Sequence, residues 1–234
     1  MLDKKIYHEL IQGIHDEFKN ENTGHDISHF YRVASLAAYL SEKESGDYDI
    51  CQLAAWTHDL GRIHEKKTGE LHFAQKQIKR IESILLSNKV PVSIVEQVSI
   101  CVREHENYQF SGDPKPSTQE SAILQDADRL DALGAFGLTR TILFSKAHGS
   151  KIWSDTYREE TWDNTDSGGS TAGHIQAKLL RLADNMNTET GRVLGVRRSV
   201  ILRAFIQGLE EEVGIVANTP LSYLQTKEHD DYLF

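Results

Sequence analysis

The sequence predicts an all-α fold, a helical bundle followed by a C-terminal helical hairpin, and three observations support this fold class. Nearly every long segment repeats its apolar residues with a period near that of an α-helix, and almost none alternates as a strand would. Polar turns separate these segments, most clearly at 111–116 and 163–169. With 234 residues, 39% of them hydrophobic and 26% charged, the chain has enough apolar material for a core.

Eight helices are expected in order along the chain. The first is amphipathic, and the third is short and apolar throughout. The segment at 91–106 is rich in β-branched residues, but its valines recur at steps of three and four, and Pro91 suits a first helical turn. The segment at 117–147 carries a long buried stripe. The expected helices cover residues 3–20, 26–44, 48–59, 71–88, 91–106, 117–147, 170–186 and 189–213.

The loop at 149–169 suggests a division of the chain into two parts. Residues 1–150 would form a metal-binding helical domain, and residues 151–234 a C-terminal helical extension packed on it. A single domain spanning 1–234 fits the same pattern. The long amphipathic helix at 189–213 could build part of a core or the interface of a homodimer.

Charge and composition narrow the function. The net charge of −9 argues against nonspecific binding to nucleic acid or to an anionic membrane as the main role. The N-terminal segment is too interrupted by charges to be a signal peptide, and no apolar stretch has the length of a membrane span. Cys51 and Cys101 lie in apolar helical surroundings and are expected to be buried free thiols. These features predict a cytoplasmic protein.

The stretch CQLAAWTHDL, residues 51–60, ends an apolar helix on the pair His58-Asp59. Burying an imidazole beside a carboxylate is costly unless something compensates for it. His29 has a related position, because it is followed by Val33 and Leu36 at helical spacing and so faces the core. Either histidine alone would more commonly be an ordinary core residue than a ligand.

A third element, at 122–133, changes this balance. Asp128 lies at the edge of its buried stripe and needs a partner there. Asp126 and Asp131 are expected to be solvated or to pair with Arg129. Two imidazoles and two carboxylates from three helices can hold a divalent metal and leave positions open for water and substrate.

In their order, these residues resemble the HD-domain metal-dependent phosphohydrolases. The resemblance includes the flanking text GHDISHFYRV, AAWTHDLGR, REHENYQF and ILQDADRLDALGAFGLTR, and the C-terminal stretch 170–212. It therefore extends over nearly the whole chain. It implies an HD-domain helical bundle and similarity to a bacterial subgroup with nucleotide-hydrolysing members.

Carried over residue by residue, the resemblance implies one divalent metal ion. Manganese is expected, with magnesium, iron, cobalt, nickel or zinc as alternatives. Asp128 is preferred over Asp126 as the last ligand, because the family's last ligand precedes a basic residue and a leucine. The implied ligands are His29, His58, Asp59 and Asp128.

Further residues are expected to serve the reaction. Asp59 would also orient the attacking water, and Arg62 is the first candidate for contact with phosphate. His72 and His105 are expected to line the pocket, where some HD enzymes use histidines for phosphate contacts or a second metal. Weaker candidates are the cations Arg32, Lys66, Lys67 and Arg129 and, for stacking on a base, Tyr108 and Phe110.

The expected function is metal-dependent hydrolysis of a phosphate ester or anhydride of a small substrate, with a nucleotide as the expected compound. The sequence contains neither a phosphate-binding glycine loop nor a nucleophile elbow. The alternative is a nucleotide-sensing HD module with little or no turnover. A two-iron oxygenase is a third, weaker alternative.

Overall fold

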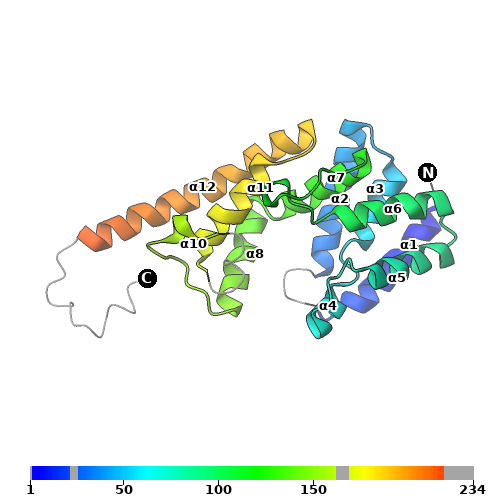
Figure 1. Ribbon diagram of the computed structural model, residues 1–234, viewed down its shortest axis with the longest axis horizontal. Coiled ribbons are helices and arrows are strands. Elements are labelled where there is room, and N and C mark those ends of the chain that lie inside the picture. Colours follow the sequence, from blue (N-terminus) through cyan, green and yellow to red (C-terminus); the bar gives the residue numbers. More distant parts are fainter. Residues whose placement is uncertain (1, 22–25, 162–168, 219–234) are drawn as a thin grey trace. The chain divides into compact units, whose positions relative to one another are not determined.

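The computed structural model describes residues 2–21, 26–161 and 169–218, and their side chains as far as residue 214. Within these ranges the ordered elements are helices, and no strand occurs (Figure 1). The predicted all-α class is therefore confirmed. Most of the expected loop at 163–169 lies outside the described residues.

The chain divides into two compact units. The first comprises residues up to 131 together with 185–194, and the second comprises residues 132–184 together with those from 195 onward. Along the sequence, the chain therefore leaves the first unit after residue 131, returns to it over 185–194 and then continues in the second unit. The division near residue 150 that the sequence suggested stays a prediction.

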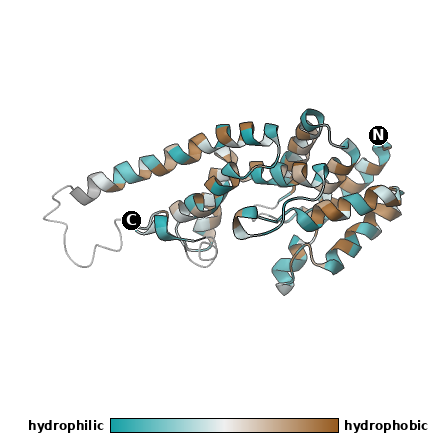
Figure 2. Ribbon diagram, turned by 45° about the horizontal axis from the view of Figure 1, so that its top comes forward, coloured by the Kyte–Doolittle hydropathy of each residue, from teal (hydrophilic) through white to brown (hydrophobic). Residues whose placement is uncertain are grey.

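The first unit is built around α3, which packs against α2, α6 and α7. Every residue of α3 from Cys51 to Thr57 is buried, so this helix needs no polar face. Its neighbours are amphipathic, with both hydrophilic and hydrophobic sides visible in Figure 2. The helices of this unit are α1 (Lys4–Phe18), α2 (Ile27–Glu44), α3 (Tyr48–Thr57), α4 (Arg62–Thr68), α5 (Gln75–Ser87), α6 (Val92–Glu104) and α7 (Gln119–Asp131).

The second unit contains the predicted C-terminal helices. The first of them is continuous but widens into a π-helical turn, η3, at its centre. The last helix, α12, begins in the stretch that belongs to the first unit. The helices are α8 (Gly134–Ala147), α10 (Thr171–His174), η3 (Ile175–Leu179), α11 (Leu180–Asp184) and α12 (Glu189–Asn218).

Two helix predictions were wrong. The single helix expected over 117–147 is broken between α7 and α8, because Leu133 is extended and Gly134 has a φ of 74°, which favours glycine. The helix α4 was missed, because seven residues are too few to show a periodicity. It ends at Gly69, whose left-handed φ of 76° terminates it.

Two other expectations agree with the structure. Cys51 and Cys101 are buried free thiols, and burial raises the pKa of Cys101 to about 12, so this thiol is unreactive. Among the described residues, no helix combines the length and the apolar character that are needed to cross a membrane.

Candidate metal centre

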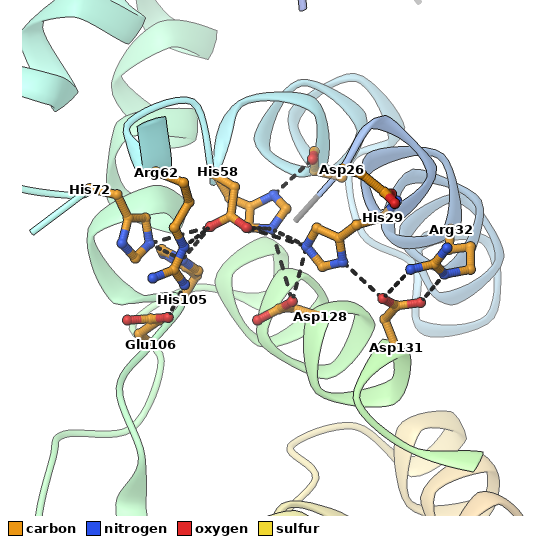
Figure 3. Close-up of polar contacts among 12 residues, drawn as sticks. Asp26, His29, Arg32, His58, Arg62, His72, His105, Glu106, Asp128 and Asp131 are labelled. Carbon is orange, nitrogen blue, oxygen red and sulfur yellow. Dashed lines mark hydrogen bonds and ion pairs between the residues drawn. The ribbon is translucent and has the colours of Figure 1, made fainter. Parts of the chain in front are cut away.

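Four residues from three helices meet inside the first unit (Figure 3). The His29 Nε2 atom lies 3.1 Å from His58 Nε2, 3.4 Å from Asp59 Oδ2 and 3.6 Å from Asp128 Oδ1. Three of these side chains are at most 1% exposed, whereas that of Asp128 is 22% exposed. We call these four residues, His29, His58, Asp59 and Asp128, the first group.

Local structure explains how the sequence brings them together. Asp26 caps α2 by accepting hydrogen bonds from the backbone of Ser28 and His29, which fixes His29 in the first turn. His58 is the residue at which α3 ends, and the chain then turns at Asp59. A Cβ atom on Gly61 would lie 2.1 Å from the carbonyl oxygen of His72, so only glycine permits this close approach.

The protonation of His58 follows from its partners. Its Nδ1 lies 2.9 Å from the carbonyl oxygen of Ala55, which can only accept, so Nδ1 carries a hydrogen. Burial lowers the pKa of His58 to about 4, and the ring is therefore neutral near pH 7. Its Nε2 consequently presents a lone pair to the first group, where a proton or a cation must compensate for it.

His29 shows how strongly the first group attracts positive charge. Its Nδ1 donates to Asp131 Oδ2 over 2.8 Å. Burial would lower the pKa of His29, but Asp131, Asp59 and Asp128 outweigh it and raise the pKa to about 9. The ring therefore takes up a proton near pH 7, at the point where a bound cation would face Nε2.

A second group lies on the other side of Asp59. His72 Nε2 lies 3.0 Å from His105 Nε2, and these nitrogens are 3.4 and 3.9 Å from Asp59 Oδ1. His105 Nδ1 donates to the carbonyl oxygen of Val102, and His72 Nδ1 lies 3.0 Å from Glu65 Oε2. Burial and the neighbouring His105 lower the pKa of His72 to about 2. We call Asp59, His72 and His105 the second group.

The donor atoms of both groups suit a divalent metal ion. Each group offers two imidazole nitrogens and a carboxylate oxygen within 4.8 Å of one another, all from buried residues. Mixed nitrogen and oxygen donors are what zinc, manganese, iron, cobalt and nickel accept. Asp59 faces the first group with Oδ2 and the second with Oδ1. The first and second groups together, which we call the cluster, could therefore hold a divalent metal.

The arginines expected to contact phosphate are held by carboxylates of the chain. Arg32 donates to both oxygens of Asp131, over 2.6 and 3.0 Å. Arg62 donates to Asp59 Oδ1 over 2.9 Å, to Glu65 over 3.0 Å and to Glu106. Lys66 pairs with Glu21.

The cluster is consequently rich in negative charge. Five carboxylates gather there with only two arginines. Arg32 and Arg62 pair with those of Asp59, Glu65, Glu106 and Asp131, whereas Asp128 lies beside His29 and His58. Burial would raise the pKa of Glu106, but Arg62 outweighs it and lowers this pKa, so the carboxyl is ionised. Without a further cation, the cluster would repel a phosphate.

Sequence reasoning misplaced two aspartates of α7. Asp126 and Asp131 were expected to be solvated or to pair with Arg129, and the first of these alternatives was wrong, since both are buried. Asp126 accepts from the backbone of Asn187 and Thr188 and from the Thr188 hydroxyl, each over 2.8 Å. Asp126 therefore binds the residues just before α12, and the aspartate that lies beside His29 and His58 is Asp128.

Three contributors to the site were missed altogether: Asp131 as a partner of His29, Glu65 and Glu106. A signal for Asp131 existed, because it follows Asp128 by three residues and so shares its helix face. Glu106 is adjacent to His105, but nothing in the sequence pairs it with Arg62. Glu65 reaches the ring of His72 because the backbone at Gly61 passes close to that of His72, which the sequence does not indicate.

Arg129 and its aromatic neighbours have structural partners. The Arg129 guanidinium donates to the carbonyl oxygens of Asn185 and Asn107, over 2.8 and 2.7 Å. The rings of Tyr108 and Phe110 stack with centroids 5.4 Å apart, and the Arg129 guanidinium lies 5.6 Å from the Tyr108 centroid. Stacking of a base on these rings stays a prediction.

A comparison with known protein families matches the region of the chain that contains both groups. The HD-domain family model matches residues 26–133. The protein YpgQ of Bacillus subtilis, itself uncharacterised, is 34% identical over 203 residues, which are 86% of this chain and 90% of YpgQ.

Solved structures resemble about nine-tenths of the chain. The crystal structure of YpgQ in complex with ADP has a TM-score of 0.69 at 30% identity, covering 89% of this chain and 95% of that one. An HD-superfamily hydrolase from Bacillus thuringiensis has a TM-score of 0.68 at 27% identity, covering 90% and 97% of the two chains.

Proposed function

Because the chain belongs to the HD-domain family, we propose that it is a metal-dependent phosphohydrolase acting on a small phosphorylated substrate, with a nucleotide as the expected compound. One observation carries the proposal. The Nε2 atoms of His29 and His58 face each other at 3.1 Å beside two carboxylates, an arrangement that calls for a cation. The ADP complex of the related YpgQ supports a nucleotide as the ligand class.

The proposed ligands of a divalent ion, manganese in first place, are His29, His58, Asp59 and Asp128. An ion held there would supply Lewis acidity towards a phosphoryl oxygen and make water more acidic. Asp59 is proposed to orient that water as well. Arg62 holds Asp59 in place through its hydrogen bond to Oδ1.

The substrate is proposed to approach from the side of Asp128. The Asp128 side chain is 22% exposed, whereas the side chains of the other three members of the first group are at most 1% exposed. His58 and His29 therefore lie behind Asp128 as seen from solvent. Such a site admits a phosphate group while the imidazoles stay shielded from water.

His72 and His105 are proposed to act on the phosphate from the second group. These two rings, of which that of His72 is neutral, and Asp59 could hold a second cation. Charge favours this arrangement, because the five carboxylates still outnumber the positive charges of two arginines and one divalent ion by one. Two ions would reverse the sign and attract a phosphate. In the absence of a second ion, the two imidazoles would face the phosphate directly.

A nucleotide panel tests the proposed function. Metal-free protein supplied with Mn²⁺ is expected to release phosphate or pyrophosphate from at least one nucleotide, and Asp128→Asn is expected to lower the rate by about a hundredfold. The matched control is Asp16→Asn, since Asp16 is exposed on α1. Inactivity of the loaded protein towards nucleotides, phosphomonoesters and phosphodiesters would contradict the proposal. Saturable nucleotide binding without turnover would support the sensing module instead.

The affinity for Mn²⁺ is expected to rise with pH. The pKa of His29 is raised to about 9, so below that pH a proton must leave Nε2 before a metal can bind. The association constant should therefore increase about tenfold per pH unit between pH 6.5 and 8.5 and level off above pH 9. His58 and His72 do not contribute in this range, because their pKa values are lowered to about 4 and 2. Calorimetric titration with Mn²⁺ at several pH values measures the slope.

The metal-free protein should show the opposite trend in stability. A folded-state pKa raised from 6.5 to about 9 contributes stability that is complete below pH 6.5 and is lost as the pH rises through 9. The melting temperature without metal is thus expected to fall over this range, and saturating Mn²⁺ should remove the decline. An affinity independent of pH would show that His29 binds no proton in competition with the metal.

A further inference from the structure

The two groups are built in the same way, although their residues come from different helices. In each, one histidine donates from Nδ1 to a carbonyl oxygen three residues earlier, and the other reaches a carboxylate. An arginine holds that carboxylate in turn. The chains are His29, Asp131 and Arg32 in the first group, and His72, Glu65 and Arg62 in the second. Figure 3 shows the first chain from end to end.

The carboxylate partner decides which nitrogen of the ring is available. An ionised carboxylate accepts hydrogen bonds and cannot donate, so the facing Nδ1 must carry the hydrogen. The remaining nitrogen, Nε2, then faces Asp59 and the second histidine of the group, where it can bind a cation in place of a proton. Such outer partners fix ring orientation and increase the basicity of the ligating nitrogen.

The arginines make the carboxylates rigid, and they do so unequally. Arg32 binds both oxygens of Asp131, which is 1% exposed and contributes its Oδ2 to His29. Arg62 divides its donors among three carboxylates and gives Glu65 one of them, and the Glu65 side chain is 24% exposed. Asp131 is therefore the more firmly held of the two.

We propose that Asp131 and Glu65 are positioning residues of the metal centre, which commit His29 and His72 to present Nε2 to the cation. Arg32 and Arg62 serve this purpose by holding the two carboxylates. The inference rests on the proposed function, because it presupposes that the cluster binds a cation. It assigns the two arginines to the chain's own carboxylates, and so leaves the attraction of phosphate to the bound cations.

Titration of metal-free protein with Mn²⁺, with the free ion followed by electron paramagnetic resonance, tests the inference without any enzymatic readout. Two binding events are expected, the tighter one at the first group, which offers Asp128 as a fourth ligand, and the weaker one at the second group. Asp131→Asn is expected to weaken the tighter event by about 10- to 100-fold. If the asparagine oxygen still accepted from His29, its amide hydrogens would face Arg32, which also only donates. The variant therefore loses a hydrogen bond to one of these two residues. Glu65→Gln is expected to weaken the second binding event, by a smaller factor, and to leave the first unchanged.

A matched control separates positioning from loss of structure. Asp126 lies on the same helix and is as buried as Asp131, but its partners are Asn187 and Thr188. Asp126→Asn should lower the melting temperature and leave the Mn²⁺ affinity unchanged. If Asp131→Asn does not fold, Arg32→Gln tests the same chain from its more exposed end and should weaken the tighter event several-fold.

The outcomes are distinct. Wild-type affinity in Asp131→Asn would overturn the assignment of Asp131, and an unchanged titration of Glu65→Gln would overturn that of Glu65. In both cases the proposed function would stand. Wild-type protein that binds no Mn²⁺ at all would overturn the proposed function together with the inference.

Discussion

Asp59→Ala is expected to abolish binding of Mn²⁺ at both groups and to lower phosphohydrolase turnover by more than about a hundredfold, the upper range for losing a residue that only orients a ligand. The reason is the shared position of this carboxylate. Its Oδ2 lies 3.4 Å from His29 Nε2 and its Oδ1 lies 3.4 Å from His72 Nε2. No other described side chain contributes to both groups.

The fold should survive this substitution. Arg62 would lose one of three carboxylate partners but keep Glu65 and Glu106. Metal content after dialysis and the circular dichroism spectrum, compared with Asp16→Ala on the exposed face of α1, separate loss of metal from loss of structure. Retention of one tightly bound Mn²⁺ by the variant would show that the two groups are independent of Asp59.

The second large effect concerns stability. Asp126→Ala is expected to lower the free energy of unfolding by about 3 kcal/mol, in the range for removing a buried, hydrogen-bonded charged group. The carboxylate accepts hydrogen bonds from Asn187 and Thr188, and the buried backbone and hydroxyl donors of Thr188 would lose this partner. A Cβ atom on Gly191 would lie 2.2 Å from Asp126 Oδ2, so the backbone is closely fitted around this side chain.

Urea denaturation of metal-free protein, followed by circular dichroism, measures this effect. The melting temperature of Asp126→Ala should fall by several degrees, while Asp16→Ala stays close to the wild type. Loss of Mn²⁺ binding in Asp126→Ala at a temperature where it remains folded would contradict the purely structural role assigned to Asp126.

The sequence carried most of the information about the first group. His29, His58, Asp59 and Asp128 each stand on, or directly after, a helix with a clear apolar stripe, so the sequence indicated that they face the core. The choice of Asp128 over Asp126 came from the resemblance to the HD-domain family. The spacing of Asp131 places it on the same helix face as Asp128, but it does not show that the partner of Asp131 is His29, 102 residues away. Glu65 lies on a helix too short to be recognised.

The break between α7 and α8 was missed for a different physical reason. Apolar residues continue through Leu130, Leu133 and Phe136, so the hydrophobic pattern predicts an uninterrupted helix. The left-handed backbone of Gly134 ends it. A glycine inside an apolar helical pattern is compatible with both outcomes, and only tertiary structure decides between them.

The use of main-chain carbonyls by His58 and His105 has a consequence for protein engineering. Their Nδ1 partners are the backbone oxygens of Ala55 and Val102, which no point substitution at those positions removes. The two rings therefore need only a regular helix end to be oriented, and positions 55 and 102 are open to other residues of suitable size. If this centre were built into another helical scaffold, Asp131 and Glu65 would have to be included to orient His29 and His72. His58 and His105 would need no additional residue, because the backbone of their own helix orients them.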